Sequence, residues 1–167
     1  MDEHLMRLRA QIDQVDQQIL DLLSRRLQIA EKVAEAKPSG ASVFRPYREA
    51  QLLARLCAKA DPQLQPVISA VWRAIISASI ARQRPDFTIL MTAKSEHTAR
   101  LFAAGQLSIK QISTPLNLCQ QLASGKADIG IVEVDELQSI HSQLGLDRPV
   151  KIIAGLPLLR QSNNVPS

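Results

Sequence analysis

The stretch from Leu5 to Lys37 constrains the fold most, because it contains neither proline nor glycine. Apolar residues recur along it three and four positions apart, at Leu5, Leu8, Ile12, Val15, Ile19, Leu22, Ile29 and Val33. This spacing is typical of a long helix that packs against other helices along one seam. At about 1.5 Å per residue the helix would be roughly 50 Å long. Such a helix is too long for a compact fold of this size, so the pattern predicts that another chain covers it.

Prolines separate the helices that follow. Pro38-Ser39-Gly40 ends the first helix, and Pro46 begins a second that runs to about Ala60. A third helix follows the stop at Asp61-Pro62, and Arg84-Pro85-Asp86 closes it. Its predicted apolar stripe consists of Leu64, Val67, Ile68, Val71, Trp72, Ile75 and Ile76, and continues into Ser79 and Gln83.

The hydrophobic period changes after Phe87. Strands are predicted at 87–92, 107–113, 127–134 and 150–155, with helices at 95–104 and from Thr114-Pro115 to Gly125. Alternating strands and helices indicate a small α/β module. The predicted domains are therefore a three-helix domain at 1–85, an α/β module at 86–160 and a frayed polar tail at 161–167, with the boundary near 84–87.

Composition excludes several classes of protein. Hydrophobic residues make up 46% and charged residues 22%, which predicts a packed soluble core. Aromatic residues make up only 3%, which disfavours nucleic-acid readers that stack bases. Cys57 and Cys119 are expected to be small buried hydrophobes, and the spacing of ligand residues predicts no metal site. Since we find no apolar signal core and no stretch of membrane-spanning length, a cytoplasmic protein is expected.

One charge falls on the apolar seam of the first helix. Position 26 continues the register of Leu5, Ile12, Ile19 and Val33, yet it is Arg26. Burying a guanidinium costs several kcal/mol unless an anion compensates it. Arg26 either extends to the surface or pairs with a glutamate, or it belongs to an internal site for an anion.

Two further cations, Arg9 and Lys37, flank the seam. Arg9 lies about 25 Å from Arg26 along the axis, and Lys37 about 16 Å away on the other side. No small ligand reaches both Arg9 and Arg26 of one straight helix, but an antiparallel partner helix could bring its Arg9 beside Arg26. The alternative is that Arg9 and Lys37 are ordinary solvated charges.

The later helices add three polar candidates. Glu49 follows Arg48 in the first turn of the second helix, where a carboxylate could also merely complement the helix dipole. Ser79 and Gln83 prolong the apolar face of the third helix, which could also be the tapering end of a core stripe. The set holds several cations, one carboxylate and two neutral hydrogen-bonding groups, without a nucleophile–base pair, a metal site or a cofactor motif.

Three separated segments carry a family resemblance: LRAQIDQVDQQILDLLSRRLQIAEKVAEAK, RPYREAQLLARL and VWRAIISASIARQ. Together they resemble the helical chorismate mutase domain, in the form that begins bifunctional chorismate mutase–prephenate dehydratases. The resemblance implies an intertwined all-helical homodimer. It also implies an isomerase (an intramolecular transferase) that converts chorismate to prephenate in the shikimate pathway of aromatic amino acid biosynthesis, without a cofactor.

The resemblance also implies roles for individual residues. Arg26 matches the arginine that holds a substrate carboxylate, and Arg9 the arginine that reaches in from the other subunit. Lys37 and Gln83 match the donors to the ether oxygen of the breaking bond. Glu49 matches the carboxylate that receives the ring hydroxyl. The pocket-lining positions are Arg48 and Ser79, and also Arg45, which stands where many relatives have aspartate.

This inventory suits the chemistry that the resemblance implies. A one-step pericyclic rearrangement needs no acid, base or nucleophile. The catalyst has to hold a dicarboxylate in its reactive conformer, and it has to stabilise the negative charge that develops on the ether oxygen.

The second module resembles, more faintly, the first lobe of a prephenate dehydratase domain, through the segment LASGKADIGIVE. The Thr-Arg-Phe catalytic motif and the second lobe are missing, so dehydratase activity is not expected. The module is then either a remnant that supports solubility or the dimer, or a ligand-sensing or docking unit. Lys94, Ser95 and His97 could hold an anion at a helix start, although polar residues that only cap a helix have the same pattern.

Two other classes of function compete with the enzyme. The sequence pI near 9.4 and the pair Arg25-Arg26 suggest a nucleic-acid-binding regulator, but the arginines are spread over three helices and Arg26 falls on the buried register. The other is a non-catalytic helical dimeriser, for which Arg26→Leu would be harmless. We expect no nucleic-acid or membrane partner.

Overall fold

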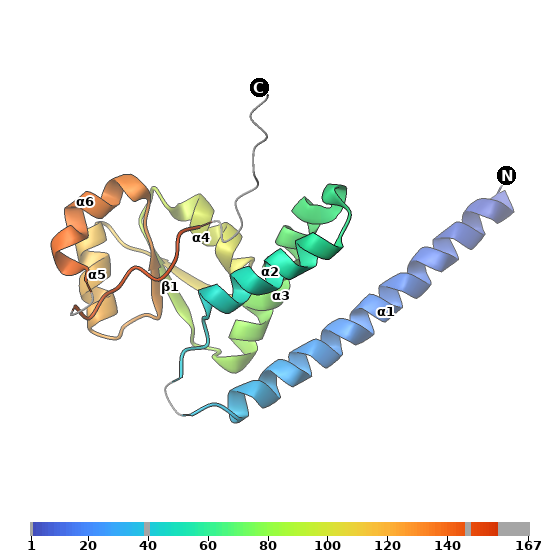
Figure 1. The fold of residues 1–167 in the computed structure, drawn as a ribbon, viewed down its shortest axis with the longest axis horizontal. Coiled ribbons are helices and arrows are strands. Elements are labelled where there is room, and N and C mark those ends of the chain that lie inside the picture. Colours follow the sequence, from blue (N-terminus) through green and yellow to red (C-terminus); the bar gives the residue numbers. More distant parts are fainter. Residues whose placement is uncertain (1, 39–40, 146–147, 157–167) are drawn as a thin grey trace, which may run out of the picture. The chain divides into compact units, whose positions relative to one another are not determined.

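The computed structural model describes residues 2–38, 41–145 and 148–156 (Figure 1). The chain divides after Ala41 into two compact units, which we describe separately. Gly40, together with Ser39 of the predicted helix stop, and the tail predicted at 161–167 lie outside the described residues.

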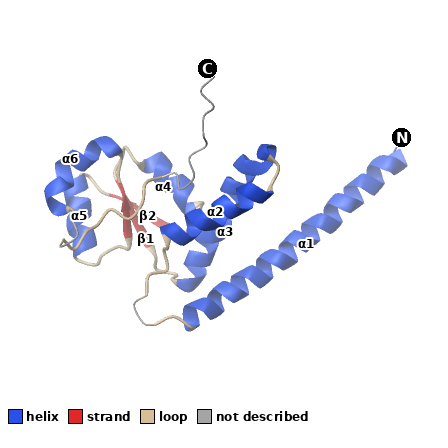
Figure 2. Cartoon of the chain, in the orientation of Figure 1, coloured by secondary structure: helices blue, strands red, loops and turns tan. Residues whose placement is uncertain are grey.

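The first unit consists of one unbroken helix, α1 (Asp2–Glu35), so the long helix expected from the sequence is confirmed. Figure 2 shows it as a single continuous rod. Its seam residues are all between 43% and 64% exposed: Leu5, Leu8, Ile12, Val15, Ile19, Leu22, Ile29 and Val33. Apart from the interruption at Arg26, these residues form an exposed apolar row, and exposed apolar surfaces of this kind often mark an interaction site.

The second unit begins with two helices that pack against each other, α2 (Pro46–Lys59) and α3 (Gln65–Gln83). Pro46 is accommodated in the first turn of α2, where its missing N–H costs no helical hydrogen bond. Between the helices, the Asp61 carboxylate accepts a hydrogen bond from the Gln63 N–H at 2.9 Å and begins a short 3₁₀ turn, Pro62–Leu64. Both helices are confirmed within one or two residues of their predicted ends.

The buried face of α3 differs from the predicted apolar stripe. Its buried residues are Ile76, Ser77, Ser79 and Ile80, whereas Val67 and Val71 are 55% and 45% exposed. The buried face contacts the neighbouring helix α4 (Glu96–Ala103), and Ser77 on this face is fully buried. Its hydroxyl donates to the carbonyl of Phe102 at 2.8 Å.

One expectation about membranes is wrong. The segment Pro62–Gln83 is long and apolar enough, by length and composition, to cross a membrane. Core helices of soluble proteins pass the same test, and α3 packs against both α2 and α4 through a face that contains Arg73 and Ser77. Through these polar contacts α3 is attached to the rest of the second unit, although only 22% of its apolar window is buried there.

The α/β module is a parallel three-stranded sheet in the order β2-β1-β3, with bounds β1 (Thr88–Met91), β2 (Ser108–Gln111) and β3 (Ile129–Ile131). Every residue of the central strand β1 is buried, as expected of a strand covered on both faces. In Figure 2 the strands lie between α4 and α5 (Pro115–Ala123). Gly130 allows α5 to lie close to β3, because a Cβ there would overlap the side chain of Leu118.

The fourth predicted strand, at 150–155, is not formed. Val150 makes only an isolated bridge with Leu144, and Ile152 and Ile153 are 65% and 57% exposed. The β-branched residues of this segment match a strand pattern but find no neighbouring strand along their length. Helix α6 (Leu137–Ile140), a single turn between two 3₁₀ turns, was not predicted from the sequence.

Helices α2 and α3 share one hydrophobic core with the sheet module. The core contains Phe44, Ile76 and Ile80 from the helical side together with Phe87, Ile89 and Phe102. At the end of α3, the Arg84 guanidinium contacts the Asp128 carboxylate at 2.8 Å, and the second oxygen of Asp128 accepts from the Thr88 N–H. The domain boundary expected near 84–87 remains a prediction.

Candidate active site

Arg26 lies on α1 at the position predicted for a site residue. It is partly buried, although the apolar residues of the same row are all exposed, and it takes part in at least one interaction within the structure. Desolvation by burial lowers the pKa of its guanidinium. A cation that has lost part of its hydration gains more from a bound anion than a fully solvated one does.

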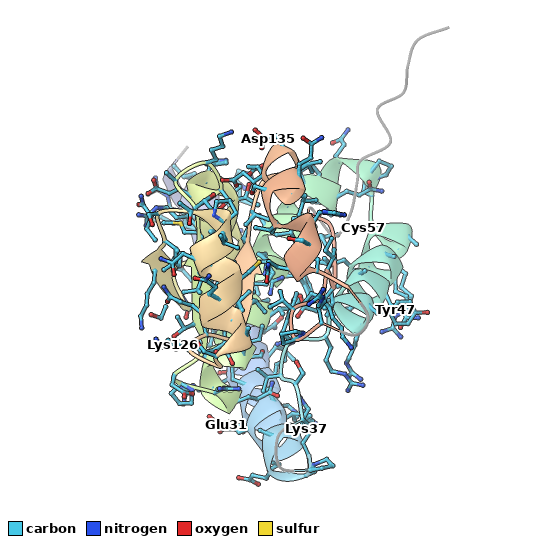
Figure 3. The ribbon with its side chains drawn as sticks, turned by 90° about the vertical axis from the view of Figure 1, so that its left-hand side faces the viewer. Glu31, Lys37, Tyr47, Cys57, Lys126 and Asp135 are labelled. Atoms are coloured by element: carbon cyan, nitrogen blue, oxygen red, sulfur yellow. The ribbon has the colours of Figure 1, made fainter. Side chains whose placement is uncertain are left out.

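Arg9 and Lys37 lie towards opposite ends of the same helix. Arg9 is exposed, while Lys37 is partly buried and follows the last turn of α1, where its N–H donates to the Ala34 carbonyl at 3.2 Å. Figure 3 labels Lys37 at this end of the helix. The helical rise places Arg9 about 25 Å from Arg26, so one copy of α1 cannot gather both around one small molecule.

Glu49 is the best-defined candidate in the second unit. It lies in the first turn of α2 and is only 7% exposed. Its Oε2 accepts a hydrogen bond from Nη1 of Arg73 on α3 at 2.8 Å. An interaction with the helix dipole does not explain why Glu49 is buried. A carboxylate at an exposed position in the first turn would complement the dipole equally well.

Arg73 is the residue that sequence reasoning missed. Besides Glu49, its Nε donates to the Ser77 hydroxyl at 3.3 Å, and its guanidinium carbon lies 4.4 Å from the centre of the Phe102 ring. Its Nη2 is buried without a hydrogen-bond partner among the described residues. The signal was present, because Arg73 lies three and four positions before the buried residues Ile76 and Ser77 and therefore on the same helical face.

Ser79 and Gln83 are adjacent on α3. The Ser79 hydroxyl donates to the Ile75 carbonyl at 2.8 Å, and the Gln83 amide donates to the Ser79 carbonyl at 3.1 Å. Ser79 is 7% exposed and Gln83 is partly buried, and both take part in further interactions.

Arg45 and Arg48 are exposed at the start of α2. Arg45 occupies the N-cap, where its carbonyl accepts from the Glu49 N–H at 3.0 Å. Within the described ranges, neither guanidinium forms an ion pair or a side-chain hydrogen bond. The structure therefore buries the carboxylate of this turn and leaves the two arginines in solvent.

The carboxyl edge of the sheet does not suit an anion. Ser95 is fully buried and donates to the Ile131 carbonyl at 2.6 Å, and Lys94 pairs with Asp135 at 2.6 Å. Their hydrogen bond raises the pKa of Lys94 and lowers that of Asp135. Glu136 also lies at this edge, where its Oε2 accepts from the Thr92 hydroxyl at 2.8 Å.

These contacts favour the simpler interpretation of the Lys94–His97 segment, as polar residues that begin a helix. Glu133 adds a third carboxylate by accepting from the Thr98 hydroxyl at 3.2 Å. In Figure 3 Asp135 marks this end of the module and Lys126 the opposite end. Within the described part of the chain, no group of three or more His, Cys, Asp or Glu side chains could hold a metal ion, and Cys57 and Cys119 are free thiols.

The helical segment is similar to a known family of proteins. Residues 8–84 match the family described as chorismate mutase type II. A bifunctional chorismate mutase/prephenate dehydratase of Neisseria gonorrhoeae is 36% identical over 86 residues, which cover 51% of this chain and 24% of the relative. Proteins of the same name from Pseudomonas aeruginosa and Stutzerimonas stutzeri are 28% and 26% identical over 144 residues, covering 80% of this chain and 39% of each relative.

The longer alignments, which cover 80% of the chain, necessarily extend past residue 84 into the α/β module. The chain spans between about a quarter and two-fifths of the length of these relatives. No solved structure matches the chain significantly.

Proposed function

Because residues 8–84 match the family described as chorismate mutase type II, we propose that this protein rearranges chorismate to prephenate. One observation carries the proposal: the matched segment contains every candidate position from Arg9 to Gln83, including the arginine on the apolar register of α1. The two competing functions, a nucleic-acid-binding regulator and a passive helical dimeriser, give no reason for that match.

The proposal includes a homodimer in which α1 pairs with its antiparallel copy. The exposed apolar row along α1 supports it, since a second α1 would remove that row from water. The helical rise supports it as well, because only a partner's Arg9 can come close to Arg26. In such a dimer each site is built from both chains.

The proposed chemistry is electrostatic and conformational. Arg26 and the partner's arginine at position 9 bind the two carboxylates and hold the substrate in its folded reactive conformer, which removes much of the entropic barrier. Lys37 and Gln83 donate to the ether oxygen as negative charge develops on it. Glu49 accepts a hydrogen bond from the ring hydroxyl of the substrate. Arg45, Arg48 and Ser79 line the pocket.

The experiment that tests the function follows purified protein with chorismate. We expect the ultraviolet absorbance of chorismate to decay while prephenate accumulates in equal amount. Prephenate should not go on to phenylpyruvate, because at the carboxyl edge of the sheet Lys94 is already paired with Asp135, and the neighbouring carboxylates Glu133 and Glu136 would repel an anionic substrate. Unchanged chorismate would refute the mutase, and phenylpyruvate would refute the proposed absence of dehydratase activity.

The pH dependence tests the role of Gln83. An amide does not titrate, so we expect the turnover number to stay nearly constant from mildly acidic to neutral pH. In Gln83→Glu the donor to the ether oxygen would be a carboxylic acid, which donates only when protonated, so turnover should fall as pH rises. The measurement is the turnover number against pH for both proteins. A sharp decline of the unmodified protein above mildly acidic pH would contradict this role.

We place the reaction in phenylalanine and tyrosine biosynthesis and the protein in the cytoplasm. The free thiols Cys57 and Cys119 are compatible with a reducing compartment.

A further inference from the structure

Arg73 and Phe102 connect Glu49 to the α/β module, and we propose that Arg73 is a positioning residue for Glu49 that Phe102 holds in place. Phe102 belongs to α4, outside the segment that matches the mutase family, whereas Glu49 and Arg73 lie inside it. The inference rests on the proposed mutase function. It gives the α/β module a part in the reaction, whereas a remnant would have none.

The first step is the orientation of the carboxylate. Arg73 engages only Oε2 of Glu49, at 2.8 Å. Among the described residues no hydrogen bond reaches Oε1, and this atom is not fully buried. One oxygen is therefore fixed by the cation, and the other stays accessible to accept a substrate hydroxyl.

The second step is the position of Arg73 itself. Its side chain is only 15% exposed, and its guanidinium lies over the Phe102 ring at 4.4 Å, within the range of a cation–π contact. Phe44 packs edge-on against the same ring, with ring centres 5.3 Å apart, so the ring is itself held by an aromatic contact.

Ser77 adds a second connection between the same elements. Its hydroxyl accepts from Nε of Arg73 at 3.3 Å and donates to the Phe102 carbonyl at 2.8 Å. Arg73 thus contacts the Phe102 ring directly and is connected to the Phe102 backbone through Ser77.

The Nη2 atom of Arg73 is buried without a hydrogen-bond partner in the part of the chain that the structure describes, so the other contacts of the guanidinium have to hold it in place. A buried guanidinium with one nitrogen unpaired depends on its remaining contacts, namely Glu49, Ser77 and the ring. Moving Glu49 away from Arg73 would leave a buried cation without its counter-charge. The pair therefore restricts the carboxylate to one orientation more strongly than an exposed ion pair would.

A double-mutant cycle on chorismate turnover tests the inference. Phe102→Met keeps the apolar volume and removes the ring. We expect it to lower kcat/KM about fivefold to tenfold, mostly through kcat, in the unmodified protein, and less than about twofold in the Glu49→Gln background. Ser77→Ala, a smaller change, should show the same dependence on background at about twofold to threefold.

The matched control is Leu107→Met, which alters the same core cluster but leaves the ring and Arg73 in place. It should change kcat/KM less than about twofold in either background. Circular dichroism and thermal melting identify any variant that fails to fold. If Phe102→Met does not fold, the result for Ser77→Ala tests the positioning role.

Equal losses in both backgrounds, or a normal kcat in Phe102→Met and Ser77→Ala, would overturn the positioning role while leaving the mutase function intact. If the unmodified protein leaves chorismate unchanged, the proposed function itself fails. The two failures are therefore distinguishable.

Discussion

Arg26→Ala should lower the turnover number for chorismate by at least about a hundredfold, because one preorganised donor in such a site typically contributes around 3 kcal/mol to lowering the barrier. The same change should leave the helix content intact, since alanine is the best helix former and α1 has no break near position 26. The measurements are steady-state kinetics, circular dichroism and the molecular mass in solution. Lys37→Ala should show a loss of similar size.

The matched control is Arg25→Ala, which removes an exposed cation one position away and leaves the apolar register untouched. It should keep nearly full activity, so net charge alone would not explain the loss at position 26.

Arg26→Leu is the more revealing variant. A leucine would continue the apolar row, so we expect a higher melting temperature together with lost activity. Near-normal turnover in Arg26→Ala would remove the central charge from the mechanism.

Much of the fold follows from local chemistry. The stretch without proline or glycine predicts α1, and Pro46 and the pair Asp61-Pro62 predict where the next two helices begin and stop. The three strands of the sheet were predicted because apolar runs alternate with helical segments. The strand expected at 150–155 fails for a different reason: strand propensity is local, whereas strand formation needs a neighbour with free hydrogen-bonding groups.

The candidate site was predictable only in part. Arg26 is conspicuous because a charge interrupts an apolar register, and such an interruption can be seen in one helix alone. Arg73 was not found, because the apolar stripe drawn along α3 ran through Val67 and Val71 instead of the face that α4 covers. Its partners Glu49 and Phe102 lie 24 and 29 positions away in the chain, and no periodicity reports contacts of that range.

Mixing two inactive variants should restore activity if each site is shared between chains. Arg9→Ala and Arg26→Ala should each lose at least about a hundredfold as homodimers. In a mixed dimer, one site combines the intact Arg26 of one chain with the intact Arg9 of the other, and the second site lacks both. When the subunits recombine freely, about half of the dimers are mixed and each has one working site of two, so about a quarter of the original activity should return.

The control for this experiment is a mixture of Arg26→Ala with Lys37→Ala. In the proposed site these two side chains come from the same chain, so every site in the mixed dimer lacks one of them and activity should stay at the level of the separate variants. The exposed row on α1 provides the physical route for exchange, because co-refolding lets two different copies bury it against each other. If the first mixture stays as inactive as the second, Arg9 does not act across the dimer, and its 25 Å separation from Arg26 (about 1.5 Å for each intervening residue) would then exclude it from the site altogether.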